Sequence, residues 1–145
     1  MKKMCDAIFI HIPFCIKKCG YCDFLSFSCE EKSKIDREQY VKKLIEEIKL
    51  YPKLNYDTVY FGGGTPSLLE VKEIQRILEE LNINIGAEVT LEVNPQTVDL
   101  EKLKGFREIG INRLSIGIQS FNNEKLKVLG RLHSRERALK TYKDA

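Results

Sequence analysis

Short apolar runs alternate with longer amphipathic stretches along this chain. Runs rich in Ile, Val and Phe, typical of strands, occupy residues 7–12, 58–62, 89–93 and 113–118. Stretches with apolar residues at helical spacing follow them at about 36–51, from 67 onward, at about 100–109, at about 123–129 and from 134 onward. This alternation predicts an α/β fold of about four parallel strands joined by crossover helices.

Capping and stop residues mark the ends of the predicted helices. We expect Asp36, Ser67 and Ser134 to cap helices, because short polar side chains accept hydrogen bonds from the first turn. Gly110 and Gly130 end two others. The last helix has no stop signal before the sequence ends, so we interpret the chain as the front portion of a larger barrel or sheet.

The two faces of the predicted strands differ in polarity, because successive side chains alternate sides. One face is apolar and suits packing under helices: Ile8, Ile10, Ile12, Val59, Phe61, Val89, Leu91, Val93, Leu114, Ile116 and Ile118. The other is mostly polar: Phe9, His11, Thr58, Tyr60, Thr90, Glu92, Ser115, Gly117 and Gln119. Burying such groups unpaired costs about 1–3 kcal/mol each, so this face is expected to line a lumen holding water or a polar ligand. The alternative is a sheet with one solvated face.

Composition narrows the function classes. The 145 residues are 43% hydrophobic and 31% charged, which is ordinary for one globular unit. The net charge is +3, and basic and acidic residues are interspersed along the chain. The sequence therefore has no clustered basic face of the kind that binds nucleic acid or a membrane surface. No apolar run approaches the roughly 20 residues of a membrane span. We expect a cytoplasmic protein.

Three of the five cysteines stand within eight positions, as C-x3-C-x2-C at Cys15, Cys19 and Cys22. Grouped thiols in a reducing compartment are more often metal ligands than disulfides. A 4Fe–4S cluster held by three thiolates keeps one iron free for a substrate. Zinc is the alternative, with His11 or Cys29 completing the ligands. The spacing favours the cluster, and we expect Cys5 and Cys29 to be free thiols unless Cys29 is a spare ligand.

Glycine-rich and polar motifs stand at the carboxyl ends of all the predicted strands. They are the cysteine loop, "GGGTP", "EVNP" and "GIQSF". Active sites of parallel α/β folds form at these ends. We therefore expect the motifs to meet in one site.

The motifs resemble a known family. "CIKKCGYC" is the signature of the radical S-adenosylmethionine (radical SAM) enzymes. With "HIPFC", "YCDF", "YFGGGTPSLL", "NRLSIGIQSFN" and "LGRLH", the chain resembles the oxygen-independent coproporphyrinogen III oxidase family from about residue 8 to 137. The resemblance implies a partial six-stranded (β/α) barrel. Residues 1–145 would be the amino-terminal portion of its radical SAM core, with the remaining strands and a carboxyl-terminal domain outside this sequence.

The resemblance also implies a site. Cys15, Cys19 and Cys22 would hold the 4Fe–4S cluster, whose free iron binds the amino and carboxylate groups of S-adenosylmethionine. Gly63, Gly64 and Thr65 would meet the methionine amino group, with glycine allowing close backbone approach. The remaining implied contacts are Tyr21 near the cofactor, Glu92 near the ribose or amino group, Gln119 at the ribose, Arg131 at the methionine carboxylate, and Phe9. Phe9 stands where the family usually has tyrosine, so only stacking is expected there.

Two branches of the family differ after the third cysteine. The oxidase continues with Gly-Cys, whereas this chain has Asp23 and Phe24, which resembles the HemW-type haem-chaperone branch, as does "VLGRLHS" around His133. This branch implies haem or porphyrin as ligand and a haem-acceptor protein as partner. The alternatives are decarboxylation of coproporphyrinogen III by a deoxyadenosyl radical, and a structural zinc module.

Overall fold

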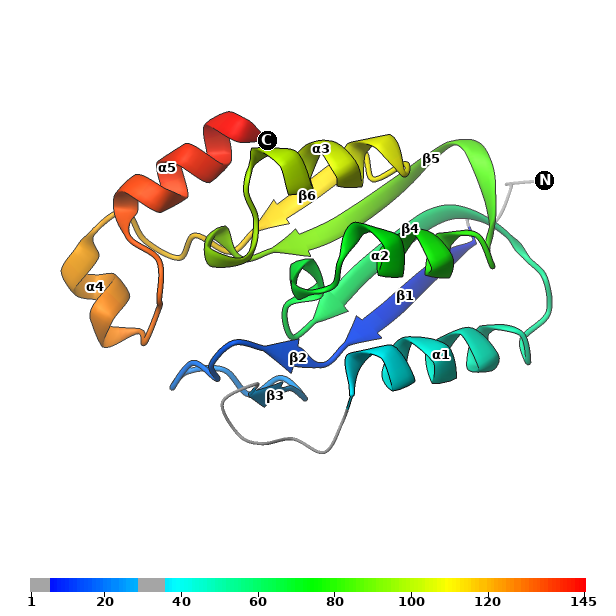
Figure 1. The fold of residues 1–145 in the computed structure, drawn as a ribbon, viewed down its shortest axis with the longest axis horizontal. Helices are drawn as coiled ribbons and strands as arrows, with labels where there is room; N and C mark the ends of the chain where they lie inside the picture. Colours follow the sequence, from blue (N-terminus) through cyan, green and yellow to red (C-terminus); the bar gives the residue numbers. More distant parts are fainter. Residues whose placement is uncertain (1–5, 29–35) are drawn as a thin grey trace.

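A parallel sheet forms the centre of the computed structural model, which describes residues 6–28 and 36–145. Its strands are β1 (Ala7–Ile12), β4 (Asn55–Gly63), β5 (Asn82–Val93) and β6 (Arg113–Ile116), hydrogen-bonded in the order β1-β4-β5-β6 (Figure 1). Each strand pairs with the next along the chain, as in a (β/α) barrel, and the order does not reverse as in a doubly wound sheet. The predicted α/β class with four parallel strands is confirmed.

Helices cover one face of this sheet. The longer crossover helices are α1 (Arg37–Ile48), α2 (Val71–Leu78) and α3 (Leu100–Glu108), and Figure 1 shows them on the same side of the strands. Beyond β6 lie α4 (Asn123–Val128) and α5 (Arg135–Asp144). The core joins the predicted apolar strand face to these helices, with Ile12, Val59, Phe61, Leu91, Val41, Ile74, Ile77 and Phe106 among its fully buried members. Sequence periodicity therefore predicted the core correctly except at Ile118, which follows the end of β6 and is not part of the core.

Two of the three predicted helix caps, Asp36 and Ser134, are confirmed. Asp36 accepts a hydrogen bond from the amide of Glu38, and Ser134 accepts one from the amide of Arg137. The prediction for Ser67 was wrong. A 3-10 turn, η1 (Pro66–Leu68), occupies this region, and α2 begins later with a capping box between Glu70 and Glu73.

Ser67 is buried and serves the connection to the next strand instead. Its hydroxyl accepts a hydrogen bond from the amide of Asn94 (3.1 Å) and pairs with the hydroxyl of Thr97 (2.6 Å). Thr97 belongs to a second 3-10 turn, η2 (Pro95–Thr97). Ser67 thus ties the segments after β4 and β5 together at the carboxyl edge of the sheet.

The strand ends differ from the sequence-based bounds. β4 and β5 begin earlier than predicted, and β5 runs through Gly86 at a φ of 82°. β6 ends at Ile116, two residues early. The amide of Gly117 still donates to Val93 O on β5, but the amides of Ile118 and Ser120 bond locally, to Ile116 O and Ile118 O. The segment after β6 is therefore a series of tight turns at the sheet's carboxyl edge.

The face opposite the helices is polar, as predicted, and its side chains pair with one another. Tyr60 donates to Glu92, and Arg113 forms an ion pair with Glu88 (3.1 Å). Phe9 on the same face is 60% exposed. In this chain the predicted lumen is therefore an open, hydrogen-bonded surface.

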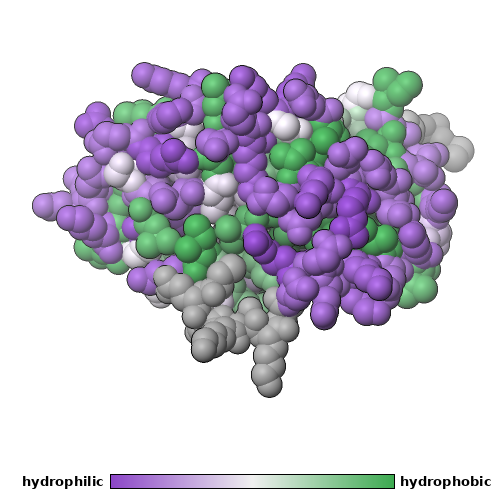
Figure 2. All heavy atoms as spheres, in the orientation of Figure 1, coloured by the Kyte–Doolittle hydropathy of each residue, from purple (hydrophilic) through white to green (hydrophobic). Residues whose placement is uncertain are grey.

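The surface seen in Figure 2 is mostly hydrophilic, with apolar side chains in scattered groups. No helix within residues 6–28 and 36–145 is long and apolar enough to cross a membrane.

Candidate functional site

A cavity of about 230 Å³ lies at the carboxyl ends of the strands. Its walls contain all of the residues implied by the family resemblance except Phe9: Cys15, Cys19, Cys22, Tyr21, Gly63, Gly64, Thr65, Glu92, Gln119 and Arg131. These residues come from five separate segments of the chain, and the fold brings them to one place. Phe9 lies earlier on β1, where its ring stacks on Tyr60 at a centroid distance of 5.7 Å.

The cysteine loop is folded back on itself. Its two ends, β2 (Phe14–Cys15) and β3 (Phe27–Ser28), pair in parallel, and the amide of Phe27 donates to Pro13 O at 2.7 Å. Inside the loop the amide of Cys22 donates to Cys19 O at 3.0 Å, forming a turn. Closing the loop in this way places three free, partly buried thiols on one cavity wall.

His11, a possible zinc ligand in the sequence, has a structural role here. Its Nε2 lies 2.9 Å from the backbone oxygen of Leu25, across the base of the cysteine loop. A Cβ at Gly63 would lie 2.4 Å from His11 Nδ1, so the ring fills the space that this glycine leaves. His11 therefore supports the loop from the sheet and does not line the cavity.

The glycine motif after β4 is packed against the chain's own backbone. The amide of Gly64 donates to Ile12 O (2.8 Å), and that of Thr65 donates to Phe14 O (2.7 Å). A Cβ at Gly64 would lie 2.7 Å from Phe14 O, closer than side chains tolerate. Glycine is thus required here by internal packing, a reason that the sequence pattern did not reveal.

Glu92 is held in place at the end of β5. Its carboxylate accepts hydrogen bonds from the hydroxyl of Tyr60 (2.8 Å) and from the amide of Gly63 (3.2 Å). Burial raises the pKa of Tyr60, and the hydrogen bond to Glu92 raises it further, so Tyr60 remains a donor. Tyr60 was predicted to lie on the polar face, but not to be the partner of Glu92.

The turn between α4 and α5 closes the cavity from the other side. Arg131 Nη2 donates to Gly117 O at 2.7 Å, and Arg131 Nη1 lies 3.6 Å from Cys19 Sγ. His133 is buried, with Nε2 3.0 Å from Ile118 O. Both side chains thus hold the segment after β6, where Gln119 adopts a φ of 69°. This left-handed conformation is uncommon for a residue other than glycine and is frequent at functional sites.

Tyr21 lies at the cavity wall between Cys19 and Arg131. Burial raises the pKa of its hydroxyl, while the Arg131 guanidinium opposes that change. The phenol therefore stays protonated and can donate a hydrogen bond into the cavity.

Other residues of the cavity wall were not predicted as cofactor contacts from the sequence. They are Lys17, Lys18, Phe24, Ser26, Val93, Asn94, Ser115 and Gly117. Lys17 and Lys18 stand inside the cysteine motif, and Asn94 inside "EVNP", so the motifs themselves carried a signal for them. With Arg131, the two lysines make the wall predominantly cationic, and Glu92 is the acidic member. Such a wall suits a ligand that carries negative groups.

The donor set fits an iron–sulfur cluster. Three thiols face one cavity, and a multi-iron cluster takes one thiolate per iron. Within residues 6–28 and 36–145, no three or more Cys, His, Asp or Glu side chains lie close enough together to hold a single metal ion. Cys5 and Cys29, including the spare-ligand hypothesis for Cys29, lie outside the described residues.

Comparison with known families agrees with this site. The model of the radical SAM superfamily matches residues 9–145, nearly the whole chain. The chain belongs to the radical SAM superfamily. This family implies a 4Fe–4S cluster and S-adenosylmethionine as cofactors, and the cysteine triplet and the cavity are where the chain can hold them.

Similar curated proteins are named as haem chaperones or as radical SAM proteins. The chain is 39% identical to the heme chaperone HemW of Escherichia coli, over 94% of this chain and 38% of that protein. It is 39% identical to HemW of Haemophilus influenzae, over 88% and 36%. It is also 39% identical to the mitochondrial radical S-adenosyl methionine domain-containing protein 1 of Danio rerio, over 96% and 32%. The chain thus spans about a third of the length of these relatives, from 32% to 38%.

Solved structures have the same fold. Coproporphyrinogen III oxidase (HemN) from Escherichia coli, described as a radical SAM enzyme, matches with a TM-score of 0.83 and 32% identity, over 94% of this chain and 33% of that chain. Elp3 from Methanocaldococcus infernus matches with a TM-score of 0.53 at 17% identity, which supports the fold alone. The four-stranded sheet therefore corresponds to a piece of a radical SAM barrel.

Proposed function

We propose that this chain is the cluster- and S-adenosylmethionine-binding portion of a haem chaperone of the HemW type. The observation that carries the proposal is the sequence after the third cysteine: Asp23 and Phe24 stand where the oxidase branch has Gly-Cys. The similarity to HemW proteins of several bacteria supports it. In this proposal the intact protein binds haem and passes it to an acceptor protein.

The residues of the cavity have distinct tasks in this proposal. Cys15, Cys19 and Cys22 hold the cluster, which when bound supplies one iron that the amino and carboxylate groups of S-adenosylmethionine can occupy. Arg131 is the cation available to the methionine carboxylate. Glu92, kept in place by Tyr60 and the Gly63 amide, is the carboxylate available to the amino group or ribose.

The remaining contacts follow from position. Gly63, Gly64 and Thr65 present backbone and a hydroxyl at the cavity wall, to which Gln119 also belongs. Tyr21 supplies a hydroxyl beside Cys19. Phe9 lies outside the cavity wall, and we propose that it acts indirectly, through its stacking on Tyr60.

Anaerobic reconstitution with iron and sulfide tests the ligand assignment. We expect about four irons and matching sulfide per chain in the wild type. Cys19→Ala should lose the cluster, whereas Cys29→Ala should keep it if three thiols suffice. Tight zinc without sulfide, or an unchanged iron spectrum in Cys19→Ala, would refute the assignment.

Assays of haem binding and of coproporphyrinogen consumption on the intact protein distinguish the chaperone function from the oxidase function. Stable haem binding with transfer to an acceptor, and no consumption of coproporphyrinogen, is the expected result. The similarity in structure to HemN favours coproporphyrinogen III oxidation as the second candidate. Turnover of coproporphyrinogen III without stable haem binding would establish that candidate instead.

We further infer a cytoplasmic location, because a triplet of ligand thiols stays reduced in that compartment. A mitochondrial location is the alternative, since similar animal proteins carry that word in their names. Fractionation of the source cells, followed by detection of the protein, distinguishes the two locations.

A further inference from the structure

Two side chains from outside the cysteine loop reach its sulfur atoms. Thr65 Oγ1 lies 3.6 Å from Cys15 Sγ, and Arg131 Nη1 lies 3.6 Å from Cys19 Sγ. Thr65 comes from the glycine motif after β4, and Arg131 from the turn between α4 and α5. The cysteine loop is thus met from two sides by hydrogen-bond donors.

We propose that Thr65 and Arg131 donate hydrogen bonds to two of the three ligand sulfurs and thereby raise the reduction potential of the cluster. Reduction adds one electron to the cluster, and part of the added negative charge falls on the thiolate sulfurs. A donor aimed at such a sulfur stabilises the reduced form more than the oxidised form. This inference rests on the ligand assignment in the proposed function.

The position of Thr65 is fixed by the backbone that carries Cys15. Its amide donates to the oxygen of Phe14, the residue before Cys15, at 2.7 Å. Thr65 itself is buried, at 7% exposure, although it borders the cavity. Cys15 Sγ is the partner that the described structure gives this hydroxyl. A buried hydroxyl with one polar neighbour will donate to it, because leaving the group unpaired costs free energy.

Arg131 is oriented by a second hydrogen bond of the same guanidinium. Nη2 is anchored on Gly117 O at 2.7 Å, which points Nη1 toward Cys19. The guanidinium is a cation with N–H groups, so it acts on the sulfur both as a hydrogen-bond donor and as a positive charge. Its Nε is buried and has no partner among the described residues, so the carbonyl, the sulfur and the neighbouring Tyr21 hydroxyl are the contacts that hold the group.

The three sulfurs are therefore not equivalent. In the described part of the chain, Cys15 and Cys19 receive side-chain donors, and Cys22 receives none. This role differs from the S-adenosylmethionine contacts implied by the family for Thr65 and Arg131. It can be measured on the cluster before S-adenosylmethionine is added.

A redox titration of the reconstituted chain without S-adenosylmethionine, followed by electron paramagnetic resonance of the reduced cluster, tests the proposal. Thr65→Val keeps the shape of the side chain and removes the donor, so its midpoint potential should shift to a more negative value. Thr65→Ser keeps a hydroxyl and should stay close to the wild type. Arg131→Met should also shift negative, and Arg131→Lys, which keeps the charge, should shift less. Unchanged potentials in Thr65→Val and Arg131→Met, at wild-type iron content, would overturn the proposal.

A measurement on the wild type alone covers the case in which a variant loses its cluster. Pulsed electron paramagnetic resonance should detect exchangeable protons coupled to the reduced cluster, and these couplings should be replaced by deuterium in D2O. Absence of any exchangeable coupling would overturn the proposal while leaving the ligand assignment intact. Failure of the wild type to assemble a cluster would overturn both.

Discussion

Gly64 illustrates how a single residue is fixed by packing before any cofactor is considered. Its position between β1 and the cysteine loop leaves no room for a Cβ beside Phe14 O and Ile12 O. The cysteine loop can therefore approach the glycine motif closely only while residue 64 lacks a side chain. Gly20, inside the cysteine loop, has no neighbour within 4 Å of where its Cβ would be, so the two glycines form a matched pair.

We expect Gly64→Ala to destabilise the metal-free chain by about 1–3 kcal/mol, because the obstructing atom is backbone and cannot rotate away. Gly20→Ala should change the free energy of unfolding by less than about 0.5 kcal/mol. Urea unfolding of both variants measures the difference. Equal effects would show that the contact with Phe14 O does not constrain this position.

His133 is a buried titratable residue whose two ring nitrogens differ in their hydrogen bonding. A carbonyl oxygen can only accept, so the proton of the neutral ring lies on Nε2, facing Ile118 O. Nδ1 has no partner in the described residues. Burial lowers the pKa of His133 and Arg131 lowers it further, while the bond to Ile118 opposes the change. Protonation would place a charge and an unpaired N–H in the interior.

The stabilising contribution of His133 should therefore depend on pH. It is fully present above the usual histidine pKa of about 6.5 and is lost as the pH falls below it, because the unfolded chain binds the proton more readily. Urea unfolding at about pH 7.5 and at about pH 5.5, on either side of that value, measures the loss. His133→Gln keeps a donor and does not titrate, so its stability should fall less between the two values. An equal fall in both proteins would rule out His133 as the source.

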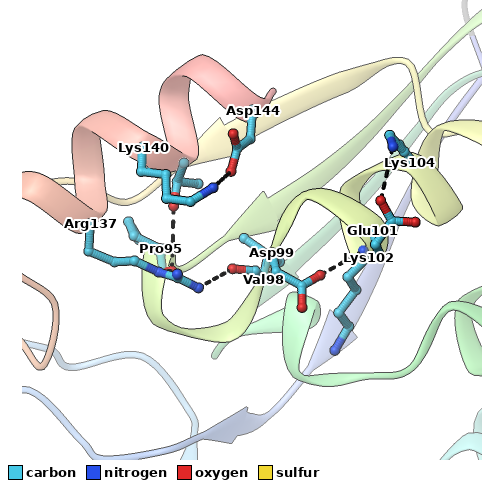
Figure 3. Close-up of polar contacts among 10 residues, drawn as sticks. Pro95, Val98, Asp99, Glu101, Lys102, Lys104, Arg137, Lys140 and Asp144 are labelled. Atoms are coloured by element: carbon cyan, nitrogen blue, oxygen red, sulfur yellow. Dashed lines mark hydrogen bonds and ion pairs between the residues drawn. The ribbon is translucent and has the colours of Figure 1, made fainter.

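At the scale of elements, α5 supports the cavity without lining it. Figure 3 shows Arg137 on α5 reaching the loop between β5 and α3, where it donates to Pro95 O (2.9 Å) and Val98 O. Thr141 on the same helix donates to Pro95 O as well. This loop follows directly after Asn94, a residue of the cavity wall. Docking of α5 thus fixes one wall of the site.

We expect Arg137→Met to destabilise the chain by about 2 kcal/mol, since the buried residues Pro95 and Val98 lose their charged donor. Lys140→Met, which removes an ion pair with Asp144 on the same helix (Figure 3), is the matched control. Its effect should stay within about 1 kcal/mol, as for other exposed pairs. Urea unfolding measures both, and a control as damaging as Arg137→Met would contradict this account.

At the scale of the whole molecule, β6 is an edge strand: one of its edges is hydrogen-bonded to β5, and the other has no strand partner in the described residues. In residues 6–28 and 36–145, β6 has β5 as its only strand neighbour. A broad groove of about 780 Å³ lies beside it, lined by Leu103, Phe106, Ile111, Leu114, Ile116 and Tyr142 among others. An unpaired strand edge beside apolar side chains is a site for association with another strand.

The 145-residue chain should therefore associate with itself as its concentration rises, and it should unfold at a lower temperature than a protein of the full length of its relatives. Light scattering across a concentration series measures the first effect, and calorimetry measures the second. A chain that stays monomeric and has a sharp, high-temperature transition would contradict both expectations.

The sequence by itself determined the class of fold, the core face and the membership of the site. Strand parity, helix spacing and caps such as Asp36 are local features, with partners a few residues away, so they can be read along the chain. The motifs at the strand ends predicted that one site lies at that edge of the sheet, and the family resemblance supplied the individual residues, of which Phe9 lies outside the cavity wall.

The tertiary structure alone decided how these residues are held. Tyr60 bonds to Glu92 across 32 positions, and Arg131 reaches Cys19 across 112. Ser67, a predicted cap, was used instead to join two loops. Such partnerships depend on sheet register and on the close approach of distant backbone segments, which no local pattern encodes, because a hydrogen bond requires agreement in both distance and direction.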